Sequence, residues 1–168
     1  ISGLYVADNM NFTHAIQIDA DGQHDLAAVT DFLDQARHNP QALVCGYPVY
    51  DQTVPLARLW GRELTNFWVH VNTRSKALKD AMCGFRVYPI AQTLPVLPSV
   101  RTRRMDFDPD IAVRLLWAGV PVINRPVRVT YPKDGISHFR GFSDNMRISR
   151  LHAGHFCTML LRRMGLAK

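Results

Sequence analysis

Short apolar segments alternate along this chain with longer segments of helical periodicity, and this alternation restricts the fold more than any other feature. Apolar residues three or four apart predict a helix, whereas apolar residues two apart predict a half-buried strand. Strands are predicted at 14–20, 42–47, 82–88 and 120–131, and helices at 1–11, 25–38, 54–73, 106–118 and 144–164. Strands in alternation with helices indicate an α/β domain with a mainly parallel central sheet flanked by helices.

The composition is that of one globular domain, residues 1–168, with 47% hydrophobic and 20% charged residues. The formal net charge of +6 favours phosphorylated ligands, nucleic acid or an anionic membrane surface, and it does not choose among them. The three cysteines form no Cys-x-x-Cys pair, which argues against a disulfide framework or a zinc site and for a reducing compartment. No apolar run reaches the roughly 20 residues that a membrane-spanning helix needs. Because the chain begins at Ile1 rather than at a methionine, we expect a fragment of a longer protein.

Some segments raise more specific structural expectations. In the helix at 54–73, a run of large apolar side chains is expected to face inward. These are Trp60, Leu64, Phe67, Trp68 and Val71. Residues 89–104 are rich in proline and then in arginine, and they are expected to form a mobile loop. The helix at 144–164 is amphipathic, so it is expected to pack on the domain, with binding to a membrane surface as the alternative.

The end of the first predicted strand carries two aspartates and a glutamine that extended geometry points to one side: Asp19, Asp21 and Gln23. Gly22 allows the backbone to turn there. Hard divalent cations take oxygen ligands, and Mg²⁺ commonly uses one or two carboxylates together with substrate phosphates. The three side chains are therefore candidate metal ligands. A simple turn leading into a helix that Asp25 caps is the competing interpretation.

A second acidic group, Met105-Asp-Phe-Asp-Pro-Asp110, begins the predicted helix at 106–118. Acidic residues at a helix N-terminus interact favourably with the helix dipole, and this structural role alone would account for them. The functional alternative is a general base beside the sugar or the acceptor. Asp106 and Asp108 are the candidates because they lie two residues apart, whereas Asp110 is expected on the helix surface.

The glycine-containing, basic segment 133–140 offers Ser137, His138 and Arg140 on a flexible backbone. Such a loop could clamp a diphosphate, because arginine binds phosphate through two hydrogen bonds and serine adds a donor. An ordinary solvated loop is the alternative.

Four segments together resemble the inverting family-two glycosyltransferases of the nucleotide-sugar-binding A-type fold, within them the branch similar to dolichyl-phosphate-mannose synthase. Asp19-Ala-Asp-Gly-Gln-His24 is similar to that branch's Asp-Ala-Asp-x-Gln-His motif, and Asp80-Ala-Met-Cys-Gly-Phe-Arg86 to its Asp-x-x-x-Gly-Phe-Arg segment. Met105-Asp-Phe107 falls where the family has an acidic residue between two apolar ones. Residues 126–137 resemble its closing strand and Gly-x-Ser loop. The resemblance covers most of residues 14–140, and it implies a Rossmann-like α/β fold.

The resemblance also implies a role for each group. The candidate metal ligands would hold Mg²⁺ or Mn²⁺ against the diphosphate of a nucleotide sugar, where the cation neutralises the departing charge. Asp106, or otherwise Asp108, would activate or orient the acceptor. Phosphate contacts are implied for Arg62, Ser137, His138 and Arg140, and a place on the acceptor side for Asp80, Gly84, Phe85 and Arg86.

The chain departs from the family pattern at the donor contacts. Gly46-Tyr-Pro48 stands where the family often has Gly-x-Arg, and Gly135-Ile-Ser-His138 where it often has Gly-x-Ser-Lys. The family builds its nucleotide-base pocket ahead of the metal motif, yet only eighteen residues precede Asp19. By analogy we expect roughly the C-terminal two-thirds of a catalytic domain, inactive by itself, with an open sheet edge that a partner covers.

The leading hypothesis is therefore a metal-dependent, inverting transfer of a sugar from a nucleoside-diphosphate sugar to a lipid phosphate or a hydroxyl. We expect a cytoplasmic enzyme at the inner face of a membrane, with a homodimer as a candidate assembly and no nucleic-acid partner. One alternative is a basic module that binds phosphate-rich partners with a steep salt dependence. Another is a nucleotidyltransferase that uses the same paired aspartates.

Overall fold

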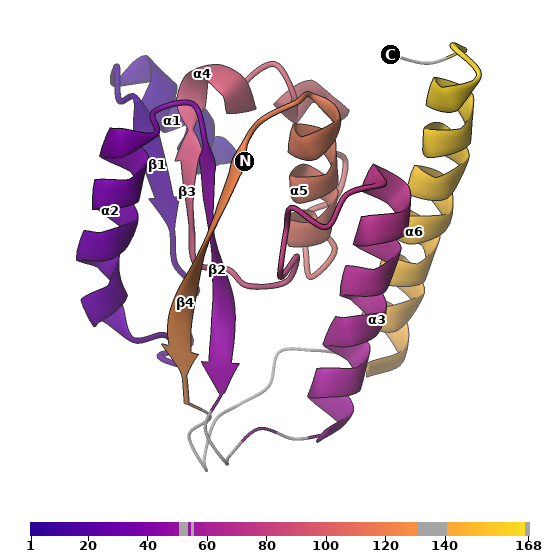
Figure 1. Cartoon of the computed structure of the whole chain (residues 1–168), viewed down its shortest axis with the longest axis horizontal. Coiled ribbons are helices and arrows are strands. Elements are labelled where there is room, and N and C mark those ends of the chain that lie inside the picture. The colour runs from indigo at the N-terminus through magenta and orange to yellow at the C-terminus, as the bar shows by residue number, and fades with distance from the viewer. Residues whose placement is uncertain (51–53, 55, 131–140, 167–168) are drawn as a thin grey trace.

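A computed structural model of the chain describes residues 1–50, 54, 56–130 and 141–166, apart from the side chains of 56–58, and it contains a four-stranded sheet with helices on both faces (Figure 1). The strands are β1 (His14–Gln17), β2 (Leu43–Tyr50), β3 (Arg86–Pro89) and β4 (Val122–Val129). The α-helices are α1 (Ser2–Asn9), α2 (Val29–His38), α3 (Leu56–Thr73), α4 (Ile90–Thr93), α5 (Phe107–Trp117) and α6 (Gly141–Arg163). Two 3-10 helices complete the order, η1 (Leu26–Ala28) and η2 (Leu97–Ser99). The predicted α/β class is confirmed.

The local signals for starting and stopping helices act as the sequence predicts. The Asp25 carboxylate accepts the backbone N–H of Ala27 at 2.9 Å and so caps η1, which leads directly into α2. Gly119 follows α5 with φ +78°, a conformation that glycine adopts without the steric penalty of a side chain. Helix boundaries in this chain therefore follow from local chemistry.

The sheet is mixed, whereas the sequence predicts a mainly parallel one. Its strand order is β1-β3-β2-β4, and β3 pairs antiparallel with both β1 and β2 while β2 and β4 pair in parallel. After α3, residues 74–85 bring the chain back across the domain before β3 begins, so β3 runs opposite to the other three strands (Figure 1). Hydrophobic periodicity marks where strands occur and not which way they run, which explains the difference.

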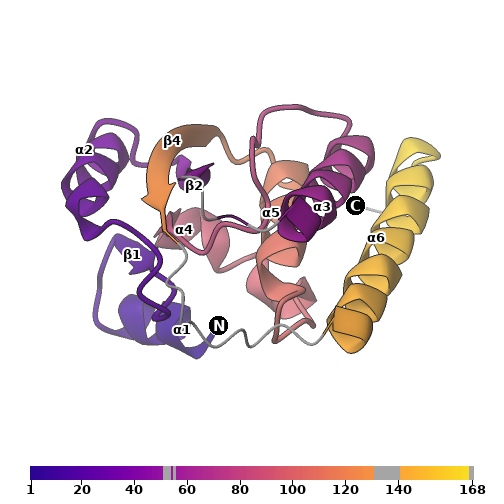
Figure 2. The same cartoon turned by 90° about the horizontal axis from the view of Figure 1, so that it is seen from below.

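Two hydrophobic layers cover the two faces of the sheet. Along β2, Leu43 faces the layer that includes α1, α3 and α5, whereas Val44 faces the layer formed with α2. Side chains two apart in a strand lie on the same face, so this alternation follows from the sequence. Each fully buried aliphatic side chain contributes about 1.5–3 kcal/mol relative to its exposed state. Helix α6 is outermost, lying against α3 (Figure 2).

Three of the five apolar side chains of α3 that were predicted to face inward are exposed, whereas Trp68 and Val71 are partly buried. Trp60 is 78% exposed, Leu64 61% and Phe67 56%. The buried side carries Asn66 and Thr65 instead, and the Asn66 side chain accepts the backbone N–H of residue 81 at 2.9 Å. The polar side of the helix is buried because it holds the loop before β3 in place, while on the apolar side Trp68 packs against Phe156 of α6.

Other boundaries also differ from the predictions. Residues 89–104 are not a mobile loop, because they form α4 and η2 and bury Ile90, Leu97 and Val100 in the core. Strand β2 continues to Tyr50 and α6 already begins at Gly141. Within the described parts of the chain, no helix is both long enough and apolar enough to cross a membrane.

Candidate functional site

A cleft of about 880 Å³ opens at the carboxyl ends of β1 and β2, where the predicted metal group lies. Its polar lining comes from the loop after β1, from α3, from the loop before β3, from the start of α5 and from α6. These residues include Asp19, Asp21, Gln23, Arg62, Gly84, Arg103, Arg104, Asp108 and Asn145. The fold thus brings together six of the ten predicted site residues that the structure describes, and these six come from segments far apart in the sequence.

The loop that carries the two aspartates is a turn held by hydrogen bonds. Gly22 has φ +71°, and the Asp21 carboxylate accepts the backbone N–H of Gln23 at 3.0 Å. The carbonyl of Gln23 accepts the N–H of Thr130 at 3.1 Å, which ties the loop to the end of β4. The turn interpretation and the ligand interpretation are therefore compatible, because the turn forms and its aspartates still line the cleft.

Asp19 lies directly on the backbone of the loop before β3. A Cβ placed on Gly84 would overlap both oxygens of the Asp19 carboxylate. Only glycine at position 84 leaves room for the Asp19 carboxylate. The backbone of the Asp80–Arg86 segment therefore lies against the carboxylate of the Asp19–His24 segment. The Asp19 side chain remains 45% exposed toward the cleft.

The donor set suits a cation that shares its ligands with a substrate. It comprises the carboxylates of Asp19 and Asp21 and the amide oxygen of Gln23, all of which line the cleft. His24 lies nearby, with Nε2 at 3.9 Å from Asp19 Oδ2. Among the residues with a described placement, no group of three His, Cys, Asp or Glu side chains could enclose a metal. Such an open oxygen set fits Mg²⁺ or Mn²⁺ completed by phosphate oxygens better than a closed protein site.

Arg62 enters the cleft from α3 and is held by Asp80. Its Nη2 donates to Asp80 Oδ1 at 3.2 Å and its Nε donates to Oδ2, while Oδ1 also accepts the N–H of Met82 at 2.9 Å. Burial opposes the charge on Arg62, but the neighbouring carboxylate outweighs it and raises the pKa of the guanidinium. Asp80 itself does not line the cleft, so it would influence a bound ligand through Arg62.

Arg86 and Phe85 lie beneath the cleft floor. Arg86 is completely buried and donates to three carbonyls, of Ala81 at 2.7 Å, Asp108 at 2.8 Å and Cys83 at 2.9 Å. Phe85 packs against the ring of His24, with centroids 5.6 Å apart. Neither Phe85 nor Arg86 lines the cleft, and both support residues that do, so their predicted acceptor-side role stays a prediction.

Asp108 is the aspartate of its group that faces the cleft, whereas Asp106 does not line it. Asp106 instead accepts the backbone N–H of Arg104 at 3.1 Å. Asp108 Oδ1 accepts a hydrogen bond from Gln17 Nε2 at 3.0 Å. Burial raises the pKa of Asp108 despite the opposing charge of Arg86 and the hydrogen bond from Gln17. Geometry therefore favours Asp108 over Asp106 for contact with a ligand in the cleft.

Asp110 is buried, contrary to the expected surface position. It accepts hydrogen bonds from Thr102 at 2.8 Å, from His155 at 2.9 Å and from Arg114. Burial would raise the pKa of Asp110, but these hydrogen bonds outweigh it and lower the pKa. The residue links α5, α6 and the segment that leads into the cleft wall, and has a structural role.

Several cleft residues carry no clear sequence signal. Gln17 occupies a position that alternation assigns only to the polar side of a strand, and Asn145 lies on a helix face with ordinary polar neighbours. Arg104 lines the cleft while its Nε lies 3.8 Å from Asp144 of α6. Cys83 also lines the cleft, but burial raises its pKa to about 11, so it is a thiol and not a thiolate nucleophile.

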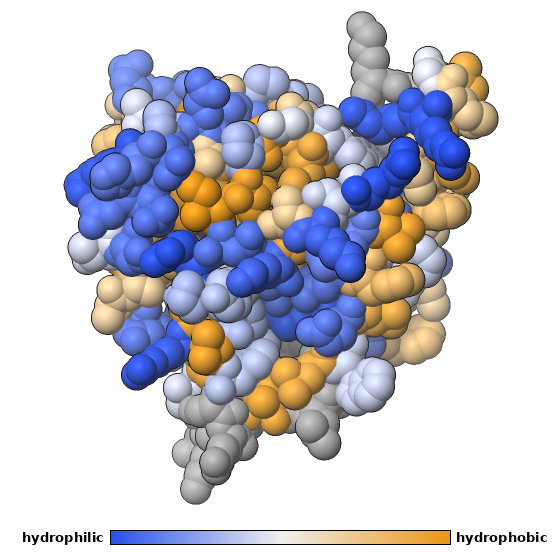
Figure 3. Space-filling view, viewed as in Figure 1, coloured by the Kyte–Doolittle hydropathy of each residue, from blue (hydrophilic) through white to orange (hydrophobic). Residues whose placement is uncertain are grey.

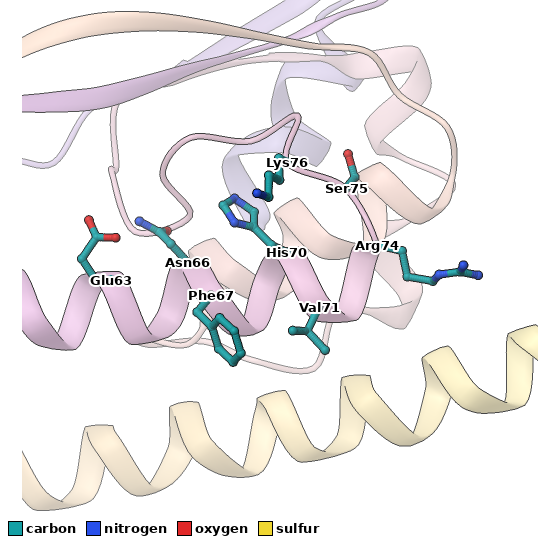
Figure 4. Close-up of a pocket in the computed structure, with 8 residues that line it drawn as sticks. All are labelled: Glu63, Asn66, Phe67, His70, Val71, Arg74, Ser75 and Lys76. Carbon is teal, nitrogen blue, oxygen red and sulfur yellow. The ribbon is translucent and has the colours of Figure 1, made fainter.

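The predicted diphosphate contacts Ser137, His138 and Arg140 lie outside the described residues. A second hollow, of about 560 Å³, runs beside α3 and the loop after it (Figure 4). Its polar groups serve the structure, because His70 Nε2 lies 2.8 Å from the carbonyl of Leu78 and Asn66 holds the backbone of residue 81. The cleft at the strand ends therefore remains the candidate site.

Comparison with known proteins supports a glycosyltransferase-like relationship and no more. The chain is 22% identical over 145 residues to a dolichyl-phosphate beta-glucosyltransferase from Dictyostelium discoideum. The matched region covers 82% of this chain and 44% of that protein, so the chain spans less than half the length of this relative. No protein-family model matches the sequence.

Proposed function

We propose that the protein transfers a sugar from a nucleoside-diphosphate sugar to an acceptor, with a divalent metal ion and with inversion at the sugar carbon. The observation that carries this proposal is the meeting, in one cleft, of a two-aspartate oxygen site with the carboxylate of Asp108 and three arginines. The similarity to a glycosyltransferase supports the same class of reaction. The whole protein's donor and acceptor are part of the proposal.

Each part of the cleft has a chemical task in this reaction. Asp19, Asp21 and Gln23 would hold Mg²⁺ or Mn²⁺, which when bound supplies positive charge to the departing diphosphate. Arg62 adds an oriented guanidinium, because two hydrogen bonds to Asp80 hold its Nε and Nη2. Preorganised charges of this kind stabilise developing charge without reorganisation during the reaction.

Asp108 would orient the acceptor and, for a hydroxyl acceptor, take its proton. The acceptor oxygen forms a bond to the anomeric carbon while the bond from that carbon to the diphosphate oxygen breaks. The electron pair of the broken bond leaves with the nucleoside diphosphate, and the hydroxyl proton passes to the Asp108 carboxylate. A phosphate acceptor is already an anion and needs no base, so there Asp108 only orients it.

A lipid-linked acceptor accords with the exposed apolar side of α3 and α6. Phe67, Trp68 and Phe156 form a row of edge-on ring contacts, with centroid distances of 5.6 and 6.2 Å, that joins the two helices. Phe142 at the start of α6 is 83% exposed, and this end of α6 also lines the cleft. Apolar side chains are visible over this side of the molecule in Figure 3.

We therefore propose that α3 and α6 lie on a lipid surface beside the cleft. Arg147, Arg150 and Arg163 are exposed on α6, and such a combination of apolar and basic residues binds anionic membranes. A lipid phosphate held at that surface would reach the cleft from the α6 side. A cytoplasmic location at the inner face of a membrane is part of this proposal.

Calorimetric titration of UDP- and GDP-sugars into the full-length protein tests the donor site. Binding is expected with Mn²⁺, and it is expected to disappear with EDTA or in Asp19→Ala. Product analysis with polyprenyl phosphate and with a hydroxyl acceptor then identifies the acceptor. Metal-independent binding, or no binding of any sugar nucleotide, would overturn the proposal. Transfer of a nucleotidyl group in place of a sugar would assign the site to a nucleotidyltransferase.

A further inference from the structure

A chain of hydrogen bonds runs from the buried centre of the sheet to the cleft. Tyr88 of β3 places its hydroxyl 3.0 Å from Gln17 Oε1, and Gln17 Nε2 of β1 lies 3.0 Å from Asp108 Oδ1. Tyr88 is 1% exposed, so bulk water does not compete for its hydroxyl. Three elements thus contribute one residue each to a continuous polar path that ends at the carboxylate in the cleft.

The direction of each donation follows from the chemistry of the groups. Burial raises the pKa of Tyr88, so its side chain stays a neutral phenol that can donate. When the phenol donates to the carbonyl oxygen of Gln17, the amide NH₂ must point toward Asp108, which as a carboxylate can only accept. The reverse amide orientation would place two oxygens against each other. The acceptor-only carboxylate of Asp108 thus sets the orientation of the Gln17 amide, and the hydrogen bond from Tyr88 stabilises that orientation.

The same contacts hold Asp108 by one oxygen and leave the other available. Arg86 Nη1 lies 3.7 Å from Oδ1, the oxygen that Gln17 already contacts, and it also donates to the backbone carbonyl of Asp108 at 2.8 Å. Within the described residues, Oδ2 of Asp108 has no hydrogen-bond partner. A carboxylate fixed on one side in this way has a defined orientation toward a ligand in the cleft.

We propose that Gln17 and Tyr88 are positioning residues that orient the Asp108 carboxylate toward the acceptor. This inference rests on the proposed sugar transfer, and it assigns a role to two residues outside the metal group and the arginines. Neither residue touches the reacting atoms in this scheme. Small errors in the position of a reacting group lower rates strongly, so the loss of this path should appear in kcat.

The test is a kinetic comparison of Tyr88→Phe, Gln17→Met and the double variant in the full-length protein. Tyr88→Phe removes one hydroxyl that does not contact Asp108, so its effect reaches the cleft through Gln17 and through Arg86, which also interacts with the phenol. We expect kcat to fall about tenfold or more in each variant, while the donor Kd and the binding stoichiometry measured by calorimetry stay unchanged. Unchanged stoichiometry excludes a loss of folded protein as the cause. Tyr5→Phe, at a 42% exposed position on α1, is the matched control and should retain full kcat.

The double variant separates a shared path from two independent effects. Its loss of kcat is expected to be clearly smaller than the product of the single losses, because the hydrogen bond from Tyr88 to Gln17 is shared by both variants. Wild-type kcat in Tyr88→Phe, or a double variant whose loss is the product of the single losses, would overturn the positioning role. If the unsubstituted protein transfers no sugar, both the proposed function and the positioning role are refuted. If the unsubstituted protein is active and Tyr88→Phe keeps its kcat, only the positioning role is refuted.

Discussion

The substitution Gly84→Ala tests the site through a single methyl group. The added Cβ would overlap the Asp19 carboxylate, while the backbone at residue 84 does not have the positive φ that would strain an alanine. The flexible side chain of Asp19 can rotate away, so folding should change little. The carboxylate, however, then leaves the position from which it would hold a metal. Displacing a group that orients metal ligands commonly costs about 10–100-fold in affinity.

We therefore expect Gly84→Ala to weaken the metal-dependent binding of a sugar nucleotide about 10–100-fold, which corresponds to roughly 1.4–2.8 kcal/mol. Calorimetry with Mn²⁺ measures the loss, and thermal unfolding measures stability in parallel. Gly61→Ala is the matched control, because Gly61 also lines the cleft but a Cβ there meets nothing within 4 Å. That control should bind normally and gain up to about 1 kcal/mol, since alanine favours a helix. Normal binding by Gly84→Ala would refute the placement of the metal site on Asp19.

Further predictions concern the acceptor, the lipid face and the buried histidine. Asp108→Asn should lower sugar transfer at least about tenfold with donor binding intact, whereas Asp106→Asn should stay near wild type; equal losses in steady-state assays would contradict the assignment. Trp60→Ser should reduce flotation with anionic liposomes and leave transfer to a water-soluble acceptor unchanged, and undiminished flotation would speak against a lipid face on α3. Burial, together with the charge of His155, lowers the pKa of His152 to about 4. The unfolded chain, with a histidine pKa near 6.5, then binds more protons, so stability should fall by about 3 kcal/mol as pH drops from about 6.5 to 4. His152→Gln should flatten this part of the curve in urea unfolding at a series of pH values, and an unchanged slope would refute the cause.

The elements of the fold follow largely from local sequence, whereas their arrangement does not. The α/β class, the capping by Asp25 and the helix at the acidic run depend on side chains within a few residues of each other, and all are confirmed. The direction of β3 and the outward side of α3 depend on contacts between distant segments. Asn66 is buried because it holds the loop before β3, and no pattern within α3 reveals that demand.

The candidate site divides in the same way. The oxygen-rich run after β1 predicts a metal site by its chemistry alone; metal binding stays a proposal, and the structure shows that these residues line the cleft. Local sequence could not choose between Asp106 and Asp108, because both fit the start of a helix. The choice depends on how the start of α5 packs against Arg86 and Gln17, which come from other strands.

The sequence by itself determined the element types, the acidic and basic groups that could carry chemistry and the resemblance to a glycosyltransferase. These depend on residue identity and short-range spacing. Only the tertiary structure decided that Gly84 leaves room for Asp19 and that Asp80 holds Arg62. It also decided that Tyr88 donates to Gln17, which in turn donates to Asp108. The physical reason is that each of these contacts joins segments far apart in the chain, and their distances arise from the packing of the sheet and its helices as a whole.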